Sequence, residues 1–418
     1  MSAEPPGRRG SVVDRQLARA REWDALVARV RSLGPGFADF LRPPRLESLL
    51  PAVGTGTLAM VNVTSTRCDA LLVEACGVRG VPLPDLDAQE AAERVSGHID
   101  RLGRVDEAAA HVRRTGRRAL ADPSFGTFHD HHTAKRHLRA AEEELDARLL
   151  DDLGWLWRTV ADPVLRAAAS NRVWWCPTGP LGFLPLHAAG HHDGSGRSVL
   201  DRAVPSSVPT LRALARARTE LLGGADRMLV IAPAAGPPLP QTAAELDLLR
   251  GLFPPHLLTV VEGADATRER VLRELRDHRW AHFSCHGRQN LLDPSHGGLL
   301  LADGVLTVAE LGAERLDGGF AFLSACMTAT GGVRLADEVI TLGAGLHYAG
   351  FRHVLATLWS VDAEAASAFA AELFPGLVTA GRLDPARTAG AATRAMRRLR
   401  DAEPERPSRW AAFTHTGP

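Results

Sequence analysis

The sequence of 418 residues predicts an α/β fold, in which a mostly parallel sheet is flanked by helices. From residue 227 onward, apolar runs of strand length alternate with stretches of helical periodicity, which is typical of a sheet covered on both faces. Two of these runs end in reactive side chains, one in Cys285-His286-Gly287 and the next in Ser324-Ala325-Cys326. Because ligands bind at the carboxyl ends of parallel strands, these runs predict a functional site at one edge of the sheet.

The individual elements follow from apolar periodicity and from turn residues. The earlier part predicts a helix at 13–32, strands at 57–63 and 70–75, helices at 88–119 and 134–169, and a strand at 172–176. Besides the two strands with reactive ends, the later part predicts strands at 227–232, 257–261, 353–359 and 410–415, and helices at 243–252, 266–277, 336–349, 362–378 and 385–402. Trp410 and Phe413 in the final strand are expected to be core residues.

Charge and cysteine content narrow the function classes. Lys and Arg together number 49, as do Asp and Glu, so there is no bulk electrostatic case for nucleic acid or for an anionic membrane. The five cysteines are scattered and odd in number, which favours a reducing compartment over a disulfide framework. No signal peptide and no apolar run of about 20 residues is present. We therefore expect a cytoplasmic protein.

A thiol and an imidazole at one sheet edge are the parts of a nucleophilic site. Cys326 is the candidate nucleophile, which would attack a peptide carbonyl and form an acyl-enzyme. His286 is the candidate acid–base, which would protonate the leaving amine and then activate water. The competing interpretation is structural, because free cysteines are often buried and a histidine at a strand end is commonly a satisfied polar group. Cys285 points to the face opposite His286 and is predicted to lie in the core.

Several motifs resemble one known family. They are the His-Gly and Ser-Ala-Cys strand ends, GGLLLADGVLTVAEL, the run at 336–362, the closing WAAFTHTG and GPLGFLPLHAAG at 179–190. Together they resemble the CHAT family of caspase-like cysteine proteases, in the wider group with caspases, separases and gingipains. Met327 departs from the pattern, because relatives often carry Glu there. The later part of the chain resembles the family closely and the earlier part more loosely.

The resemblance implies a caspase-like sheet and a division into three parts. These are an N-terminal tail and helix at 1–45, a pseudo-caspase-like α/β lobe at 46–222 and a catalytic caspase-like lobe at 223–418. It also implies that the backbone N–H groups of Gly287 and Cys326 form the oxyanion hole. Relatives often carry helical repeats upstream, but no period of about 34 residues occurs here. We therefore expect either no sensor array or a chain cut from a longer one.

The segment Trp359-Ser360-Val361-Asp362 follows the next predicted strand. In caspase-like proteases this edge pairs with the substrate backbone, so the resemblance implies a substrate-binding role. The alternative makes Trp359 a cap on the core. Asp337 lies just past the candidate nucleophile, at the start of a predicted helix. An acid there is favoured by the helix dipole alone, but it could also line a pocket that selects Arg or Lys.

The sequence predicts neither a metal site nor a cofactor. The cluster His129-Asp130-His131-His132, with His137 nearby, is expected to be a polar loop before a helix, because consecutive histidines rarely converge on one ion. No phosphate-binding loop of the GxxxxGK[ST] type occurs.

Two functions remain open at this point. The first is an endopeptidase that cuts a partner protein at an extended loop. The resemblance implies, for bacterial relatives, activation of a defence effector such as a gasdermin-like pore former by way of a sensor or regulatory partner. The second is a catalytically silent scaffold that binds peptides or partner proteins. An intact His and Cys pair argues against the scaffold.

Overall fold

The computed structural model describes residues 7–37, 40–219, 223–233, 235–236, 239–288, 293–324 and 342–418. Residues Met1–Pro51 form one compact unit, with helices α1 (Gly7–Arg31) and α2 (Leu46–Leu49). Residues Ala52–Pro418 form the second unit, which carries all the predicted site residues.

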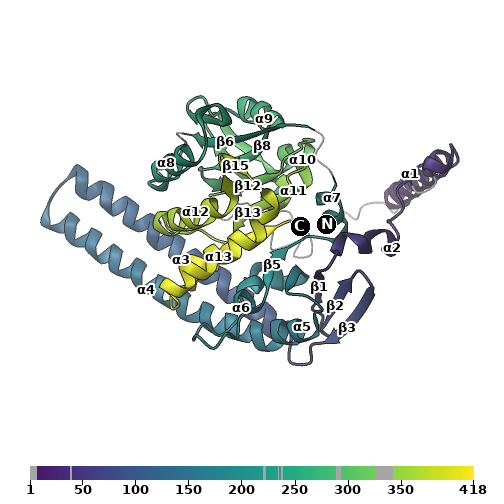
Figure 1. The fold of residues 1–418 in the computed structure, drawn as a ribbon, viewed down its shortest axis with the longest axis horizontal. Coiled ribbons are helices and arrows are strands. Elements are labelled where there is room, and N and C mark those ends of the chain that lie inside the picture. The colour runs from purple at the N-terminus through teal and green to yellow at the C-terminus, as the bar shows by residue number, and fades with distance from the viewer. Residues whose placement is uncertain are drawn as a thin grey trace. The chain divides into compact units, whose positions relative to one another are not determined.

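The second unit is built on one eleven-stranded sheet in the order β3-β2-β1-β4-β5-β16-β13-β12-β8-β6-β7 (Figure 1). Its strands are β1 (Thr57–Asn62), β2 (Asp69–Glu74), β3 (Gly77–Pro82), β4 (Arg172–Pro177), β5 (Val204–Ser207), β6 (Ala225–Pro233), β7 (Leu258–Gly263), β8 (His278–Phe283), β12 (Phe320–Leu323), β13 (His353–Thr357) and β16 (Phe413–Thr416). Seven of the ten neighbouring pairs are parallel, which confirms the predicted mostly parallel sheet.

Strand β16 joins two halves of this sheet that run in opposite directions. It pairs with β5 in parallel and with β13 antiparallel. The strands β13, β12, β8, β6 and β7 are parallel to one another, so all their carboxyl ends lie at the same edge. Both predicted reactive strand ends belong to this half. Because one sheet runs through both predicted lobes, the boundary at residue 222 stays a prediction.

Helices and short strands complete the unit. The helices are α3 (Ala88–Ala121), α4 (Phe125–Leu156), α5 (Asp162–Ala167), α6 (Val199–Arg202), α7 (Leu211–Ala217), α8 (Gln241–Leu252), α9 (Arg268–Asp277), α10 (Val308–Ala313), α11 (Leu342–Ala349), α12 (Ala363–Leu377), α13 (Thr388–Ala402) and α14 (Pro407–Trp410). The short strands are β9 (Gly287–Arg288), β10 (Gly298–Leu301), β11 (Gly304–Thr307), β14 (Val378–Thr379) and β15 (Arg382–Leu383). Across the described ranges, no helix combines the length and the hydropathy that a bilayer crossing needs.

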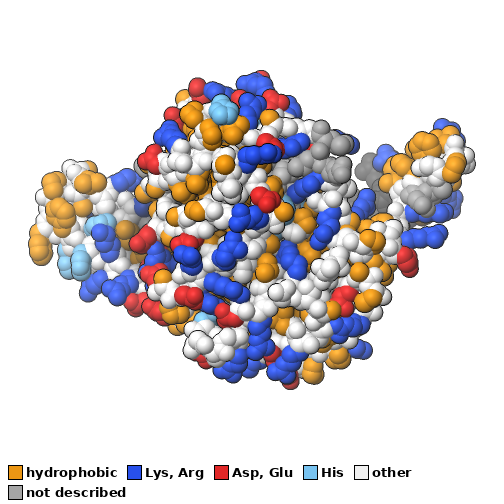
Figure 2. Space-filling model, in the orientation of Figure 1, with side chains coloured by type: hydrophobic (Ala, Val, Ile, Leu, Met, Phe, Trp, Pro, Cys, Tyr) orange, Lys and Arg blue, Asp and Glu red, His pale blue; other side chains and the backbone are white. Residues whose placement is uncertain are grey.

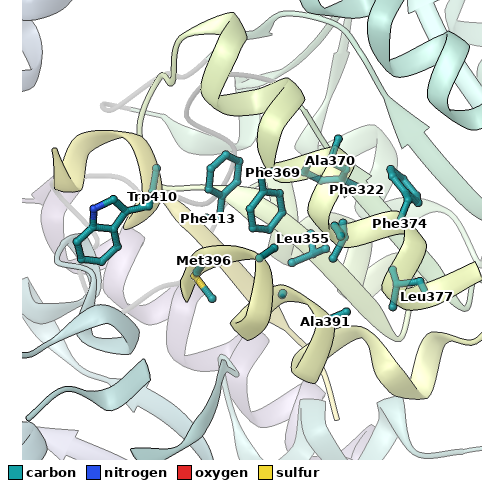
Figure 3. Packing of buried hydrophobic residues seen from close by; sticks show 14 of the residues in the cluster. Phe322, Leu355, Phe369, Ala370, Phe374, Leu377, Ala391, Met396, Trp410 and Phe413 are labelled. Carbon is teal, nitrogen blue, oxygen red and sulfur yellow. The ribbon is translucent and has the colours of Figure 1, made fainter. Parts of the chain in front are cut away.

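Both faces of the site-bearing half are buried. Because side chains alternate along a strand, Phe320 and Phe322 of β12 pack with α8, α12 and α13, whereas Ala321 and Leu323 pack with α9, α10 and α11. On the first face, the ring of Phe369 stacks on that of Phe413 with centroids 3.8 Å apart (Figure 3). Phe413 and Trp410 are both buried, as predicted, although Trp410 closes α14 instead of opening the final strand.

Helices α3 and α4 form a long antiparallel hairpin that extends away from the sheet (Figure 1). Helix α4 begins earlier than predicted, at Phe125, because Ser124 and Thr127 form a reciprocal capping box. The histidine cluster that begins at His129 therefore lies inside a helix, and the predicted polar loop is wrong. Apolar side chains gather at the hairpin tip (Figure 2), where Phe125 is 89% exposed.

Candidate functional site

The carboxyl ends of β8 and β12 lie side by side at one edge of the sheet. The two strands are parallel neighbours whose register pairs their last residues, Phe283 and Leu323. Just beyond them, the backbone N–H of Ser324 donates a hydrogen bond of 2.9 Å to the Phe283 carbonyl. The chain therefore leaves both strands at the same level. From there the sequence continues to His286 on one side and to Cys326 on the other.

His286 is held by the backbone of a second, three-stranded sheet, in the order β11-β10-β9. Its carbonyl accepts a hydrogen bond of 2.9 Å from the N–H of Leu300. The next residue, Gly287, is the first residue of β9 and pairs with Leu299 of β10. The His286 side chain itself is half-buried. The ladder thus restrains the backbone at this position, and the residue as a whole is partly exposed.

Gly236, in the loop after β6, lies against the imidazole of His286. A Cβ atom at this position would be 2.7 Å from Cδ2 and 3.2 Å from Nε2 of the ring. The φ angle of Gly236 is also +85°, in the left-handed region that residues with a Cβ rarely adopt. For both reasons, only glycine lets the loop pass so close to the ring.

A buried carboxylate joins the two strand ends. Glu245, on α8, is 2% exposed. Its Oε1 accepts a hydrogen bond of 2.5 Å from Oγ of Ser324. Its Oε2 accepts one of 2.7 Å from Oγ of Ser284 and one of 3.0 Å from Nε2 of His282. The hydroxyl of Thr242 lies 2.9 Å from Oγ of Ser284 and extends the network to the start of the helix.

This carboxylate is charged despite its burial. Burial alone raises the pKa of Glu245, but the attraction of the His282 ring and the hydrogen bonds from its three donors outweigh that effect, so the pKa lies below the ordinary value for Glu. Because Glu245 can only accept, Nε2 of His282 carries the donated proton. Nδ1 of His282 is buried and has no hydrogen-bond partner among the described residues.

The predicted substrate-binding residue Trp359 is a core residue. Its side chain is 1% exposed, and its Nε1 donates a hydrogen bond of 2.8 Å to the carbonyl of Ser408. The ring also makes an edge-on contact with His98, with centroids 5.3 Å apart. The indole is therefore packed in the core, as the alternative interpretation expects, and a role for Trp359 in binding a substrate stays a prediction.

The residues after Trp359 remain near the surface. Ser360 and Val361 are half-buried and follow β13, whose carboxyl end lies at the same edge as those of β8 and β12. Asp362 caps helix α12 by accepting a hydrogen bond of 2.8 Å from the N–H of Ala365, and it forms an ion pair of 2.8 Å with Arg409. A role for these three residues in binding a substrate stays a prediction.

Other predicted residues have simpler outcomes. Cys326 and Asp337 lie outside the described residues. Cys285 is 1% exposed and belongs to the core on the face of α9, α10 and α11, as predicted. Within the described ranges, His, Cys, Asp and Glu side chains form no group of three or more that could hold a metal ion.

Gly236 and Glu245 were not found by sequence reasoning. The sequence does hold a signal for Glu245, because Gln241, Glu245 and Leu249 recur every four residues and are all buried on one stripe of α8. A carboxylate on such a stripe indicates a buried, partnered charge. For Gly236 the signal is only a glycine in a loop that follows a strand.

Two crystal structures of the Saccharomyces cerevisiae separase–securin complex are similar to this chain. The first has a TM-score of 0.55 and 12% identity over 89% of this chain and 30% of that chain. The second has a TM-score of 0.53 and 11% identity over 88% of this chain and 30% of that chain. At such identity the likeness shows a shared fold, and this chain spans less than a third of the separase chain.

Sequence comparison agrees with the fold. No curated protein matches the chain. A family model described as the CHAT domain matches residues 150–418, well over half of the sequence, and this range includes both strand ends and the Glu245 network. The chain therefore belongs to the CHAT domain family.

Proposed function

We propose that the protein is a cysteine endopeptidase in which Cys326 is the nucleophile and His286 is the acid–base. One observation supports this most directly. The chain leaves β8 and β12 at the same level, through Ser284 and Ser324, and both serines donate to Glu245. Each candidate lies two residues after its serine in the sequence. The thiol and the imidazole are therefore separated from the Glu245 carboxylate by the same short length of chain.

The reaction would proceed in two steps. The thiolate of Cys326 attacks the carbonyl carbon of the scissile peptide bond and forms a carbon–sulfur bond. As the carbon–nitrogen bond breaks, the imidazolium of His286 gives its proton to the leaving amine. A water molecule then loses a proton to His286 and attacks the acyl carbon. The carbon–sulfur bond breaks, the acid product leaves, and the thiolate is restored.

Backbone groups would stabilise the developing oxyanion. We assign this role to the N–H groups of Gly287 and Cys326, and loss of one such donor typically costs about 2.7–4 kcal/mol of transition-state stabilisation. The substrate backbone would pair with Ser360 and Val361, next to the helix cap at Asp362. Asp337 would line the pocket for a basic residue before the cut. In this proposal residues 223–418 form the catalytic lobe and residues 46–222 a non-catalytic one.

The substrate in this proposal is another protein, cut in the cytoplasm at an extended loop. Support comes from the separase structures, which are complexes with a second protein, securin. A sensor or regulatory partner would control the cut. Among possible substrates we favour an effector of bacterial defence, such as a gasdermin-like pore former.

Mapping of new N-termini tests the proposal. A bacterial proteome is incubated with the wild type, with Cys326→Ala and with His286→Ala, and new N-termini are identified by mass spectrometry. We expect a set of cuts that only the wild type produces. Equal sets from all three proteins would contradict the proposal.

A silent scaffold would respond differently to an electrophilic peptide probe. Cys76 is exposed and serves as an internal reference thiol. Labelling of Cys326 ahead of Cys76 supports the peptidase. If Cys76 reacts while Cys326 stays unlabelled, the protein binds peptides without cutting them.

A further inference from the structure

Among the described residues, the side chains that donate directly to Glu245 come from the two strands that lead to the proposed dyad. His282 and Ser284 belong to β8 and the turn after it, and Ser324 follows β12. Both oxygens of the carboxylate are used, one for each strand. Glu245 thus bridges β8 and β12 at their carboxyl ends, in addition to the backbone ladder between them.

The two serines are fixed through the main chain as well as the side chain. The N–H of Ser284 donates 2.9 Å to the carbonyl of Ile231 on β6, and the N–H of Ser324 donates 2.9 Å to the carbonyl of Phe283 on β8. Each serine therefore ties its segment both to a neighbouring strand and to α8. The next two residues lead to His286 in one segment and to Cys326 in the other.

Joining two strands through a buried charged group is energetically unfavourable compared with joining them through apolar packing. Taking a carboxylate out of water has a large desolvation cost, and apolar side chains of similar volume often stabilise a core as well or better. A carboxylate differs from them in its geometry, because it accepts several directional hydrogen bonds at defined positions. The position of this one, below the proposed dyad, therefore indicates a role in placing side chains.

We propose that Glu245 is the positioning residue of the site, which sets the separation of the two segments that carry His286 and Cys326. This inference rests on the proposed endopeptidase function. Glu245 does not touch substrate and acts only through Ser284 and Ser324. An amide at residue 245 has one acceptor oxygen in place of two and carries no charge, so Glu245→Gln turns an NH₂ group either towards Ser324 or towards Ser284 and His282. Either orientation weakens the bridge between the two segments.

The experiment measures the site in two ways on the full chain. The first is the rate at which iodoacetamide alkylates Cys326, read from the peptide that contains it. The second is kcat and KM for a peptide taken from a mapped cleavage site. For Glu245→Gln we expect the alkylation rate and kcat to fall by roughly 10- to 100-fold, the effect of a misplacement of about 1 Å, with KM within about twofold of wild type.

A matched control separates positioning from stability. Glu74 is also a buried carboxylate, and it accepts 2.8 Å from the Thr57 hydroxyl and 3.0 Å from the N–H of Ala169. We expect Glu74→Gln to lower the melting temperature while the alkylation rate of Cys326 and kcat stay at wild-type values. Ser324→Ala and Ser284→Ala each remove one donor and provide a milder test if Glu245→Gln does not fold.

The outcomes distinguish this inference from the function on which it rests. If the wild type cleaves protein, and the alkylation rate of Cys326 and kcat are unchanged in the residue 245 and serine variants, the positioning role is overturned. The endopeptidase function is then retained. If the wild type cleaves nothing but Cys326 is alkylated more slowly in those variants, the endopeptidase function is overturned and the positioning role is supported. If the wild type cleaves nothing and the variants are alkylated at the wild-type rate, both proposals are overturned.

Discussion

The α-carbon of Gly236 lies so close to the imidazole of His286 that a Cβ atom there would come 2.7 Å from Cδ2 of the ring. The loop after β6 therefore forms one wall around the proposed acid–base. Because this loop and β10, which bonds the His286 backbone through Leu300, come from other parts of the sequence, the position of His286 depends on them as well as on β8.

Gly236→Ala should impair the site more than the fold. The new methyl group pushes the His286 ring away, and the left-handed φ costs about 1–2 kcal/mol for a residue with a Cβ. We expect kcat to fall by roughly 10- to 100-fold. Peptide-cleavage kinetics and thermal unfolding measure the two effects. Gly263→Ala is the control, because its φ is +62° and nothing lies within 4 Å of the new Cβ. Equal activity loss in both variants would refute the steric argument.

His98→Phe should stabilise the protein most in acid. Burial, with a smaller contribution from Arg101, lowers the pKa of His98 from 6.5 to about 4. Below pH 6.5 the unfolded chain binds a proton that the folded chain does not, so stability is complete above pH 6.5 and is lost as the pH falls towards 4. At pH 5 the loss is about 2 kcal/mol, and phenylalanine removes it.

The measurement for His98→Phe is chemical unfolding at pH 8 and at pH 5. Both ring nitrogens of His98 are buried without a partner among the described residues, so some gain is expected at either pH. The difference between the two pH values carries the prediction. A gain of the same size at both would show that the ring does not titrate as the structure implies.

Phe413→Ala should destabilise the strand that joins the two halves of the sheet. The ring stacks on Phe369 with centroids 3.8 Å apart and is 1% exposed, so truncation leaves a cavity. Such changes cost about 3–5 kcal/mol, which urea unfolding would detect. The control is Phe125→Ala at the hairpin tip, where the side chain is 89% exposed and little change is expected. Similar losses in both variants would contradict the packing argument.

Asp337→Ala tests the proposed pocket for a basic residue. Loss of the carboxylate removes the partner of Arg or Lys before the cut, so cleavage after these residues should fall relative to other cuts. Mapped N-termini from the variant and the wild type provide the comparison. Asp303→Ala is the control, because its carboxylate is engaged with the N–H of Arg268 at 2.9 Å. An unchanged cleavage pattern in Asp337→Ala would remove this residue from the site.

The sequence predicted the elements whose signals are local. β12 was found because it is a continuous apolar run, as expected for a strand buried on both faces, and β8 because Trp280, Ala281 and Phe283 lead directly to the Cys285-His286 end. β3 (Gly77–Pro82) was missed because it is an edge strand with mostly exposed residues, two glycines and a proline. The packing of the Trp359 indole could not be predicted, because Ser408, which accepts its N–H hydrogen bond, lies 49 residues further along the chain.

The site was predictable only in part, because contacts between residues far apart in the sequence leave no local pattern. His286 stands out because it ends an apolar run. Glu245 meets its partners His282 and Ser324 across 37 and 79 residues of chain, and no local pattern encodes those contacts. Burial of a polar side chain can be suspected from helical periodicity, but the identity of its donors depends on which strands become neighbours.

The position of β16 in the sheet determines when, during synthesis, the sheet can be completed. During translation, residues 413–416 are made after every other strand of the sheet, and yet they insert between β5 and β13. In the described sheet, strand pairing joins the half that carries His286 to the other half through β16, so this pairing forms only after residues 413–416 have been made. If the protein is the proposed endopeptidase, the sheet that carries its dyad is therefore completed only after the residues of β16 have left the ribosome.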